Sequence, residues 1–199
     1  MVFRQKKDLT YDNIYLPSQE ILQGGKRISN TEKKEFLISI VTVVFNNKNY
    51  LEETIKSVLE QKVSLEYIII DGGSTDGTID VIKKYQNSLN LWISKNDEGI
   101  YDAMNEGIKY STGKYIGFLN SGDLYFPNSL SIIENYIKKF NDIDFIFGTV
   151  LKKKIKHGFS KNKVCWSFDF YPSHSSGFFI SNKTQKKIGL YDLQFKLSA

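Results

Sequence analysis

The sequence has little that would cross-link the chain or hold it in a membrane. Its 199 residues contain one cysteine, Cys165, so no disulfide can form within the chain, and this usage fits a reducing compartment. No apolar run approaches the roughly 20 residues that a membrane helix needs, and the first residues lead into polar sequence without a signal-peptide core. We therefore expect a cytoplasmic protein, with peripheral association at the inner face of the plasma membrane as the alternative.

The chain also lacks a large excess of charge of either sign. Its 27 basic and 22 acidic residues leave a net charge of only +5. This excess is compatible with acidic substrates, phosphates or an anionic membrane surface, and it selects none of them. We expect no nucleic-acid partner. The sequence shows no internal repeat or low-complexity tract, and its length suits a single domain with a sizeable core.

Apolar segments with β preference alternate with segments of helical period from residue 36 onward. The segments that predict strands are 37–45, 65–71, 89–94, 114–119 and 143–150, with a further candidate at 177–181. This alternation with short connections predicts an α/β domain over residues 36–199, with a doubly wound, mostly parallel sheet. Residues 1–35 lack a clear period and are interpreted as an N-terminal extension.

The most informative segment, residues 68–78, reads I-I-I-D-G-G-S-T-D-G-T. Its isoleucines predict a buried strand that stops at Asp71. Gly72 and Gly73 let the backbone turn, and Ser74 to Asp76 are all suitable helix N-caps. Because ligands bind at the carboxyl ends of the strands in open α/β sheets, Asp71 is a candidate site residue.

Acidic residues follow two further strands, at Asp97 and Asp123. In a parallel sheet these carboxylates and that of Asp71 lie on the same edge. One could hold a divalent cation on a diphosphate, because Mg²⁺ sites often use one or two carboxylates plus phosphate. Another could bind a nucleobase; since a carboxylate only accepts hydrogen bonds, it suits the ring N–H of uracil, thymine or guanine. The alternative is that each acid caps a helix or lies in solvent.

Four ordered segments carry a family resemblance that runs from about residue 36 to residue 199. They read F-L-I-S-I-V-T-V-V-F-N from 36, I-I-I-D-G-G-S-T-D-G-T from 68, N-D-E-G-I-Y-D-A-M-N-E-G-I from 96, and G-K-Y-I-G-F-L-N-S-G-D from 113. Together they resemble glycosyltransferase family 2, the inverting GT-A (nucleotide-diphospho-sugar transferase) fold, and within it the bacterial polysaccharide and O-antigen transferases. The resemblance implies transfer of a sugar from a UDP, dTDP or GDP donor to a glycan or lipid-linked acceptor in cell-surface polysaccharide synthesis.

The resemblance also implies roles for individual residues. Asp71 matches the acid that binds the nucleobase, and Asp97 matches an acid that lines the nucleotide pocket. Asp123 matches the metal ligand, which implies Mn²⁺ or Mg²⁺ as the cofactor. The other implied substrate-binding residues are Thr42, Phe45 and Asn46 at the end of the first strand, Tyr101, Asp102 and Asn105 beside the sugar nucleotide, and Asn120 and Ser121.

The chain departs from the family pattern at the expected metal site. Where relatives carry a D-x-D motif, this chain has Asn120 and Gly122 ahead of Asp123. A neutral asparagine coordinates through its carbonyl less strongly than a carboxylate. We therefore expect weaker metal affinity, with the diphosphate supplying most of the ligands.

A second departure concerns the general base that inverting transfer requires. In the family this base is an acid that follows G-x-F/Y-D. Here G-L-Y-D ends at Asp192, and the expected base would lie beyond Ala199, so the sequence predicts a fragment or a truncated chain. Asp192 and His174 are weak candidates for the base.

Other function classes fit the sequence less well. A non-catalytic remnant that binds a nucleotide sugar but lacks the base is the main alternative. A nucleotidyltransferase would carry a glycine- and arginine-rich triphosphate loop, but residues 45–50 read F-N-N-K-N-Y. A dinucleotide-dependent oxidoreductase would show G-x-G-x-x-G after the first strand. The lysines at 152–163 favour a solvated loop over a site for a pyrophosphate-linked lipid.

Overall fold

The structure of the protein is a computed structural model that describes residues 21–29, 34–140, 142–152, 155–156 and 174–194. Cys165 and the greater part of the lysine-rich stretch at 152–163 lie outside these residues. Within the described part of the chain, no helix combines the length and the apolar character that crossing a bilayer would require.

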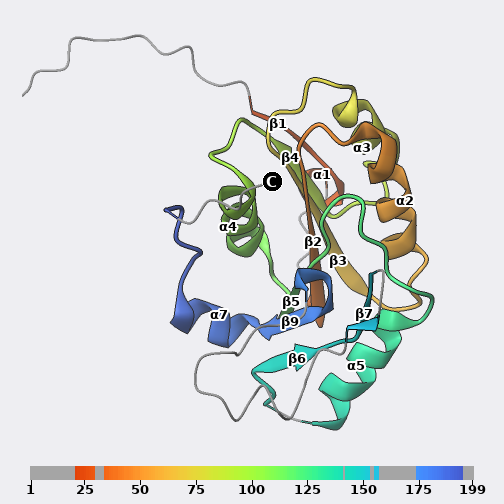
Figure 1. The fold of residues 1–199 in the computed structure, drawn as a ribbon, viewed down its shortest axis with the longest axis vertical. Helices are drawn as coiled ribbons and strands as arrows, with labels where there is room; N and C mark the ends of the chain where they lie inside the picture. The colour runs from red at the N-terminus through yellow and green to blue at the C-terminus, as the bar shows by residue number, and fades with distance from the viewer. Residues whose placement is uncertain (1–20, 30–33, 141, 153–154, 157–173, 195–199) are drawn as a thin grey trace, which may run out of the picture.

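A seven-stranded sheet runs through the middle of the molecule in the order β1-β4-β3-β2-β5-β9-β6 (Figure 1). Four neighbouring strands are parallel: β4 (Leu91–Ser94), β3 (Leu65–Asp71), β2 (Ile38–Val44) and β5 (Tyr115–Phe118). Three are antiparallel to their neighbours, with β1 (Leu22–Gly24) on β4, β9 (Phe178–Ser181) on β5 and β6 (Phe145–Phe147) on β9. The strands β7 (Val150–Leu151) and β8 (Ile155–Lys156) form a separate ladder.

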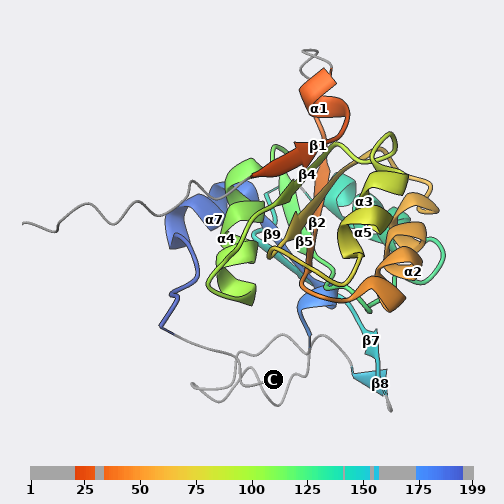
Figure 2. The same ribbon diagram turned by 90° about the horizontal axis from the view of Figure 1, so that it is seen from above.

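Helices connect these strands and cover both faces of the sheet (Figures 1 and 2). They are α1 (Lys26–Ser29), α2 (Lys48–Leu59), α3 (Thr78–Tyr85), α4 (Ile100–Tyr110), α5 (Ser129–Lys139) and α7 (Asn182–Ile188), with a 3₁₀ turn η1 (Ser175–Gly177). The helices α2, α3 and α5 pack on one face, and α4 packs on the other (Figure 1).

The alternation of side chains along each strand builds two hydrophobic cores. In β2, Ile40 joins the core under α2, α3 and α5, whereas the next residue, Val41, joins the core under α4. In β3, Ile69 and Ile70 divide in the same way. Since both faces are covered, β2 and β3 are buried along nearly their whole length, as parallel strands usually are.

The α/β class and the doubly wound, mostly parallel sheet are confirmed. One strand differs from the sequence-based prediction, and the structure adds the direction of another. Residues 143–150 do not form one strand, because Gly148 donates its N–H to the Gly177 carbonyl at 2.6 Å and the chain then leaves the sheet before β7. The strand expected at 177–181 exists as β9, but it inserts antiparallel between β5 and β6.

Part of the segment interpreted as an extension belongs to the sheet. The strand β1 pairs with β4 from Leu22 opposite Ser94 to Gly24 opposite Trp92. Gly24 is required at this crossing, because a Cβ there would lie 2.4 Å from Nε1 of Trp92. The described residues 21–29 therefore complete one edge of the domain.

Candidate functional site

Four loops meet at the carboxyl edge of the parallel strands, as the sequence predicts. They follow β2, β3, β4 and β5, and hydrogen bonds tie three of them together. Asn46 donates its backbone N–H to Ser74 Oγ and accepts one from Thr75 N–H through Oδ1, both at 2.8 Å. Asn47 donates through Nδ2 to the Ser121 carbonyl at 3.1 Å. The loops therefore form one connected unit.

The helix α2 starts from this unit in a way that the sequence does not predict. The helix begins at Lys48, directly after Asn47, whose side chain makes no capping hydrogen bond. No side chain of α2 caps this end; instead the Lys48 N–H donates to Asp76 Oδ2 at 3.0 Å. A carboxylate from the neighbouring loop thus satisfies one of the free N–H groups at the helix start.

The Asp71 carboxylate is buried at the end of β3, with 0% of the residue exposed. Its Oδ2 accepts hydrogen bonds from Gly73 N–H at 3.1 Å, Ser74 N–H at 3.0 Å and Ser94 Oγ at 2.6 Å. Its Oδ1 accepts one from Ser74 Oγ at 2.5 Å. The carboxylate therefore fixes the turn after β3 and links it to the end of β4.

A cavity of about 900 Å³ opens beside this turn. Its lining is Val43, Val44, Phe45, Gly72, Gly73, Asn96, Asp97, Gly99, Ile100 and Ala103. Its size lies within the range of about 300–1,000 Å³ that is usual for small-molecule sites. Among the sequence-predicted residues, Phe45 and Asp97 line it, whereas Asp71 lies beneath it.

Asp97 is the acid that the cavity exposes. Its Oδ1 accepts the Gly99 N–H at 2.9 Å, which holds the carboxylate at the start of α4. Partial burial raises the pKa of Asp97 above its usual range, and repulsion from Asp102 and Asp71 adds to this rise. The cavity therefore places one partly desolvated acceptor among largely apolar walls.

A second polar group lies at the end of β5. The Asp123 carboxylate and Nδ1 of His174 are 3.6 Å apart, and both side chains are partly buried. Burial raises the pKa of Asp123, while His174 and Lys152 act in the opposite direction. Asn120 lies three residues before Asp123. Its Oδ1 atom is buried and has no hydrogen-bond partner within the described residues. Nδ1 of His174 also contacts Ser176 Oγ at 2.7 Å and accepts the Ser176 N–H at 3.4 Å. The carboxylate of Asp123 and the Oδ1 of Asn120 therefore have free acceptor capacity, whereas Nδ1 of His174 is engaged within its own turn.

Asn105 uses its side chain on the protein itself. Its Nδ2 donates to the Tyr191 carbonyl at 2.9 Å, and its Oδ1 accepts the Tyr191 N–H at 2.8 Å. The Tyr191 ring also stacks on Tyr101, with centroids 5.2 Å apart. These contacts fix the segment before Asp192 against α4, whose first residues line the cavity.

We expect replacement of Asn105 by alanine to release this segment, because two hydrogen bonds, each contributing about 1 kcal/mol, are lost together. Hydrogen exchange at the Tyr191 amide should accelerate about tenfold or more relative to the wild type. The matched control is Asn135→Ala on the exposed face of α5, which should leave that amide unchanged. Equal protection of Tyr191 in both variants would contradict this anchoring role.

The remaining predicted residues have other surroundings. Thr42 is buried, shares a hydrogen bond with the Tyr67 hydroxyl at 3.1 Å and does not line the cavity. Asp102 accepts the Glu98 N–H at 3.2 Å at the start of α4. Asp192 is exposed and accepts the Gln194 N–H at 2.9 Å, as a turn-capping acid does. No substrate role for these residues is tested by the structure, and the roles implied by the resemblance stay predictions.

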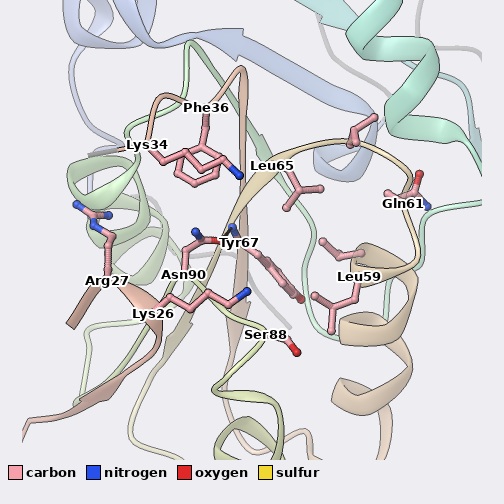
Figure 3. Close-up of a pocket in the computed structure, with 12 residues that line it drawn as sticks. Lys26, Arg27, Lys34, Phe36, Leu59, Gln61, Leu65, Tyr67, Ser88 and Asn90 are labelled. Carbon is pink, nitrogen blue, oxygen red and sulfur yellow. Dashed lines mark hydrogen bonds between the residues drawn. The ribbon is translucent and has the colours of Figure 1, made fainter. Parts of the chain in front are cut away.

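A smaller cavity of about 310 Å³ lies at the opposite edge of the sheet (Figure 3). Its lining includes Phe36, Leu65 and Asn90, which lie at or just before the amino ends of β2, β3 and β4. The side chains of Lys26 and Lys34 border it (Figure 3). Because it is formed at the amino ends of the strands, it is separate from the site at their carboxyl ends.

The fold is the GT-A fold of nucleotide-sugar transferases. Staphylococcus aureus TarS 1–349 in complex with UDP superposes with a TM-score of 0.69 at 19% identity, over 81% of this chain and 52% of that chain. The mannosyltransferase PcManGT from Pyrobaculum calidifontis, in complex with GDP-Man and Mn²⁺, gives 0.62 at 15% identity, over 80% and 48% of the two chains.

The chain belongs to glycosyl transferase family 2, whose sequence model matches residues 39–193. An uncharacterized glycosyltransferase of Mycobacterium tuberculosis is 30% identical over 172 residues, which cover 81% of this chain and 65% of the relative. A PGL/p-HBAD biosynthesis glycosyltransferase of Mycobacterium bovis is 28% identical over 178 residues, covering 82% and 66%. The chain thus spans about two thirds of the length of these relatives.

Proposed function

We propose that this chain binds a nucleotide-sugar donor of the UDP, dTDP or GDP type and takes part in inverting, metal-dependent sugar transfer. The acceptor would be a glycan or a lipid-linked glycan in cell-surface polysaccharide synthesis. The observation that carries the proposal is the cavity of about 900 Å³ beside Asp97, at the strand edge that also presents Asp123. A base and ribose would fill the cavity, and the diphosphate would extend toward Asp123.

The relatives support this choice of ligand. TarS is known in complexes with UDP and UDP-GlcNAc, and PcManGT in a complex with GDP-Man and Mn²⁺. The name of the Mycobacterium bovis relative places that protein in PGL/p-HBAD biosynthesis. For this chain we propose a nucleotide-sugar donor, a glycan or lipid-linked acceptor, and peripheral contact with the membrane surface.

The residues present fit a divalent cation bound together with a diphosphate. Asp123 would be the main protein ligand. His174 Nδ1, 3.6 Å from its carboxylate, would be a second ligand if it exchanged its contact with Ser176 for the cation. The unpartnered Oδ1 of Asn120 is the third available donor atom. Oxygen and imidazole donors suit Mn²⁺, and Mg²⁺ keeps mainly the oxygens. When bound, the cation would stabilise charge on the leaving nucleoside diphosphate.

The general base is the other group that the proposed transfer requires. Inverting transfer needs a group that takes the proton of the acceptor hydroxyl. Of the two weak candidates, Asp192 is exposed and caps a turn, and His174 lies beside Asp123. The alternative is a nucleotide-sugar-binding protein that does not transfer. The two hypotheses are distinguished by incubating the protein with a nucleotide-sugar donor and an acceptor mixture. A transferase releases nucleoside diphosphate, whereas a binding protein does not.

Donor binding is testable by thermal unfolding with UDP, dTDP and GDP, each with and without Mn²⁺. At about a hundredfold excess over Kd, a ligand of the native state stabilises it by about 2.7 kcal/mol, which raises Tm by about 5 °C or more. Asp123→Ala is expected to abolish the Mn²⁺-dependent part of the shift. The control Asp80→Ala, at an exposed position of α3, should retain it. The absence of a shift with every nucleotide would refute the proposal.

A further inference from the structure

The buried carboxylate at the end of β3 has no access to a ligand in the cavity. Asp71 is fully buried, and all four of its hydrogen bonds come from the turn after β3 and from Ser94. A nucleobase could reach it only if this turn opened. The carboxylate that the strand pattern points to is therefore a structural group in this fold.

Gly72, the residue after Asp71, leaves space in which the side chain of Asp97 reaches the cavity. Gly72 lines the cavity, and a Cβ built on it would lie 2.7 Å from Asp97 Oδ2. Because position 72 has no side chain, the carboxylate of Asp97 occupies that space. Its Oδ1 is bound to the Gly99 N–H, whereas its Oδ2 has no hydrogen-bond donor among the described residues.

We propose that Asp97, and not Asp71, is the residue that recognises the nucleobase of the donor, by accepting its ring N–H through Oδ2. This inference rests on the proposed function, because it assumes that the cavity binds a nucleoside diphosphate. A carboxylate is an acceptor only. It selects uracil and thymine, through N3–H, or guanine, through N1–H, and rejects cytosine and adenine, whose corresponding ring nitrogens are acceptors.

The surroundings of Asp97 suit the base rather than the sugar hydroxyls. Val43 and Ala103 provide apolar walls, and Phe45, 62% exposed, lies at the cavity with its ring available for stacking. A flat base gains from such contacts, whereas ribose and diphosphate need polar partners along their length. Partial desolvation of the carboxylate strengthens its preference for a donor over an acceptor.

The inference predicts a defined pattern of affinities in isothermal titration calorimetry. The wild type should bind UDP, dTDP or GDP about 10- to 100-fold more tightly than CDP and ADP, the range expected for a hydrogen bond to a charged group. If a pyrimidine nucleotide is the preferred ligand, N3-methyl-UDP should lose the same factor. If GDP is the preferred ligand, N1-methyl-GDP should lose the same factor of affinity.

Asp97→Asn is the sharpest variant, because it keeps the Oδ1 acceptor for Gly99 and places an NH₂ group where Oδ2 stands. Affinity for the preferred nucleotide should fall about tenfold or more, and preference over CDP should vanish. Asp80→Asn is the matched control and should leave both unchanged. Gly72→Ala is a second variant; its new methyl group displaces Asp97 and should reduce affinity in the same direction.

Acidification provides an independent readout. The pKa of Asp97 is raised by burial, so the ionised acceptor is lost at a higher pH than for an ordinary aspartate. Wild-type affinity should fall as pH drops through this raised pKa, and the fall should be absent in Asp97→Asn. Wild-type binding of UDP with unchanged affinity and discrimination in Asp97→Asn would overturn the inference and leave the proposed function intact. If the wild type binds no nucleoside diphosphate at all, the proposed function fails, and the inference fails with it.

Discussion

Replacing Asp71 by alanine is expected to lower the free energy of unfolding by about 3–4 kcal/mol. The change leaves three buried donors, from Ser74 and Ser94, and the partly buried N–H of Gly73 without their acceptor. Each unsatisfied buried donor costs about 1–3 kcal/mol, and relief of the carboxylate's own desolvation offsets part of the sum. Loss of this acceptor would loosen the turn after β3 and its link to β4.

Urea denaturation measures this loss, with Asp80→Ala as the control for removal of an exposed acid from the neighbouring helix. The control should change the free energy of unfolding by no more than about 0.5 kcal/mol. The opposite pattern is equally informative. An Asp71→Ala protein with wild-type stability but no affinity for nucleotides would restore the nucleobase role that the family resemblance implies for Asp71.

The fold was largely predictable from local patterns, because each parallel strand is a short, mainly apolar segment. The β2 and β3 segments are buried over nearly their whole length, so the sequence marks them clearly. The pairing of β9 was not predictable. Its four residues, Phe178–Ser181, carry no signal for strand direction, and β9 inserts antiparallel between β5 and β6. The three-residue strand β1 is too short to carry a periodic signal.

The edge of the sheet at which the three acids lie was predictable, whereas the surroundings of each acid were not. Three acids at strand ends predicted one edge, and the parallel order of β3, β4 and β5 places them there. Sequence does not say which carboxylate turns inward. Asp71 does so because four donor groups of the turn and of β4 converge on it, whereas Asp97 projects outward because Gly72 leaves room. The pairing of Asn105 with Tyr191 joins residues 86 positions apart, which no local pattern reveals.

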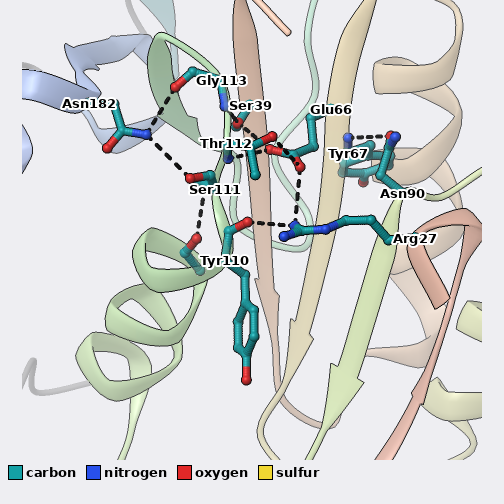
Figure 4. A network of polar contacts seen from close by, with 11 residues as sticks. Arg27, Ser39, Glu66, Tyr67, Asn90, Tyr110, Ser111, Thr112, Gly113 and Asn182 are labelled. Carbon is teal, nitrogen blue, oxygen red and sulfur yellow. Dashed lines mark hydrogen bonds and ion pairs between the residues drawn. The ribbon is translucent and has the colours of Figure 1, made fainter. Parts of the chain in front are cut away.

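Replacing Arg27 by alanine is the other change for which we expect a large effect, about 2–3 kcal/mol of unfolding free energy. Arg27 donates from Nη1 to Glu66 Oε1 at 3.2 Å and to the Tyr110 carbonyl at 2.6 Å (Figure 4). Breaking a buried pair costs about 3–5 kcal/mol, and we reduce this figure because the Arg27 side chain is 38% exposed and partly screened. What remains is the cost of a buried carboxylate without its counter-charge.

The loss of unfolding free energy in Arg27→Ala stays substantial because the Glu66 carboxylate is buried. It is 0% exposed near the start of β3, where Ser39 Oγ donates to its Oε2 at 2.6 Å. Thr112 donates to both oxygens, from N–H at 2.7 Å and from Oγ1 at 2.9 Å (Figure 4). These neutral donors satisfy its lone pairs but supply no positive charge. Only the guanidinium of Arg27, from the segment before β2, does so among the described residues.

A double-mutant cycle with Glu66→Gln separates the charge interaction from packing. If Arg27 acts mainly as the counter-charge, Arg27→Ala should cost much less in the Glu66→Gln background, with a coupling energy of about 1–3 kcal/mol. Arg27→Lys should retain part of the stability, since it keeps the charge but loses the planar fork that reaches two acceptors. Additive effects of the two single changes would show that Glu66 is held by its neutral donors alone. In that case the N-terminal segment would stabilise the domain through β1 and not through Arg27.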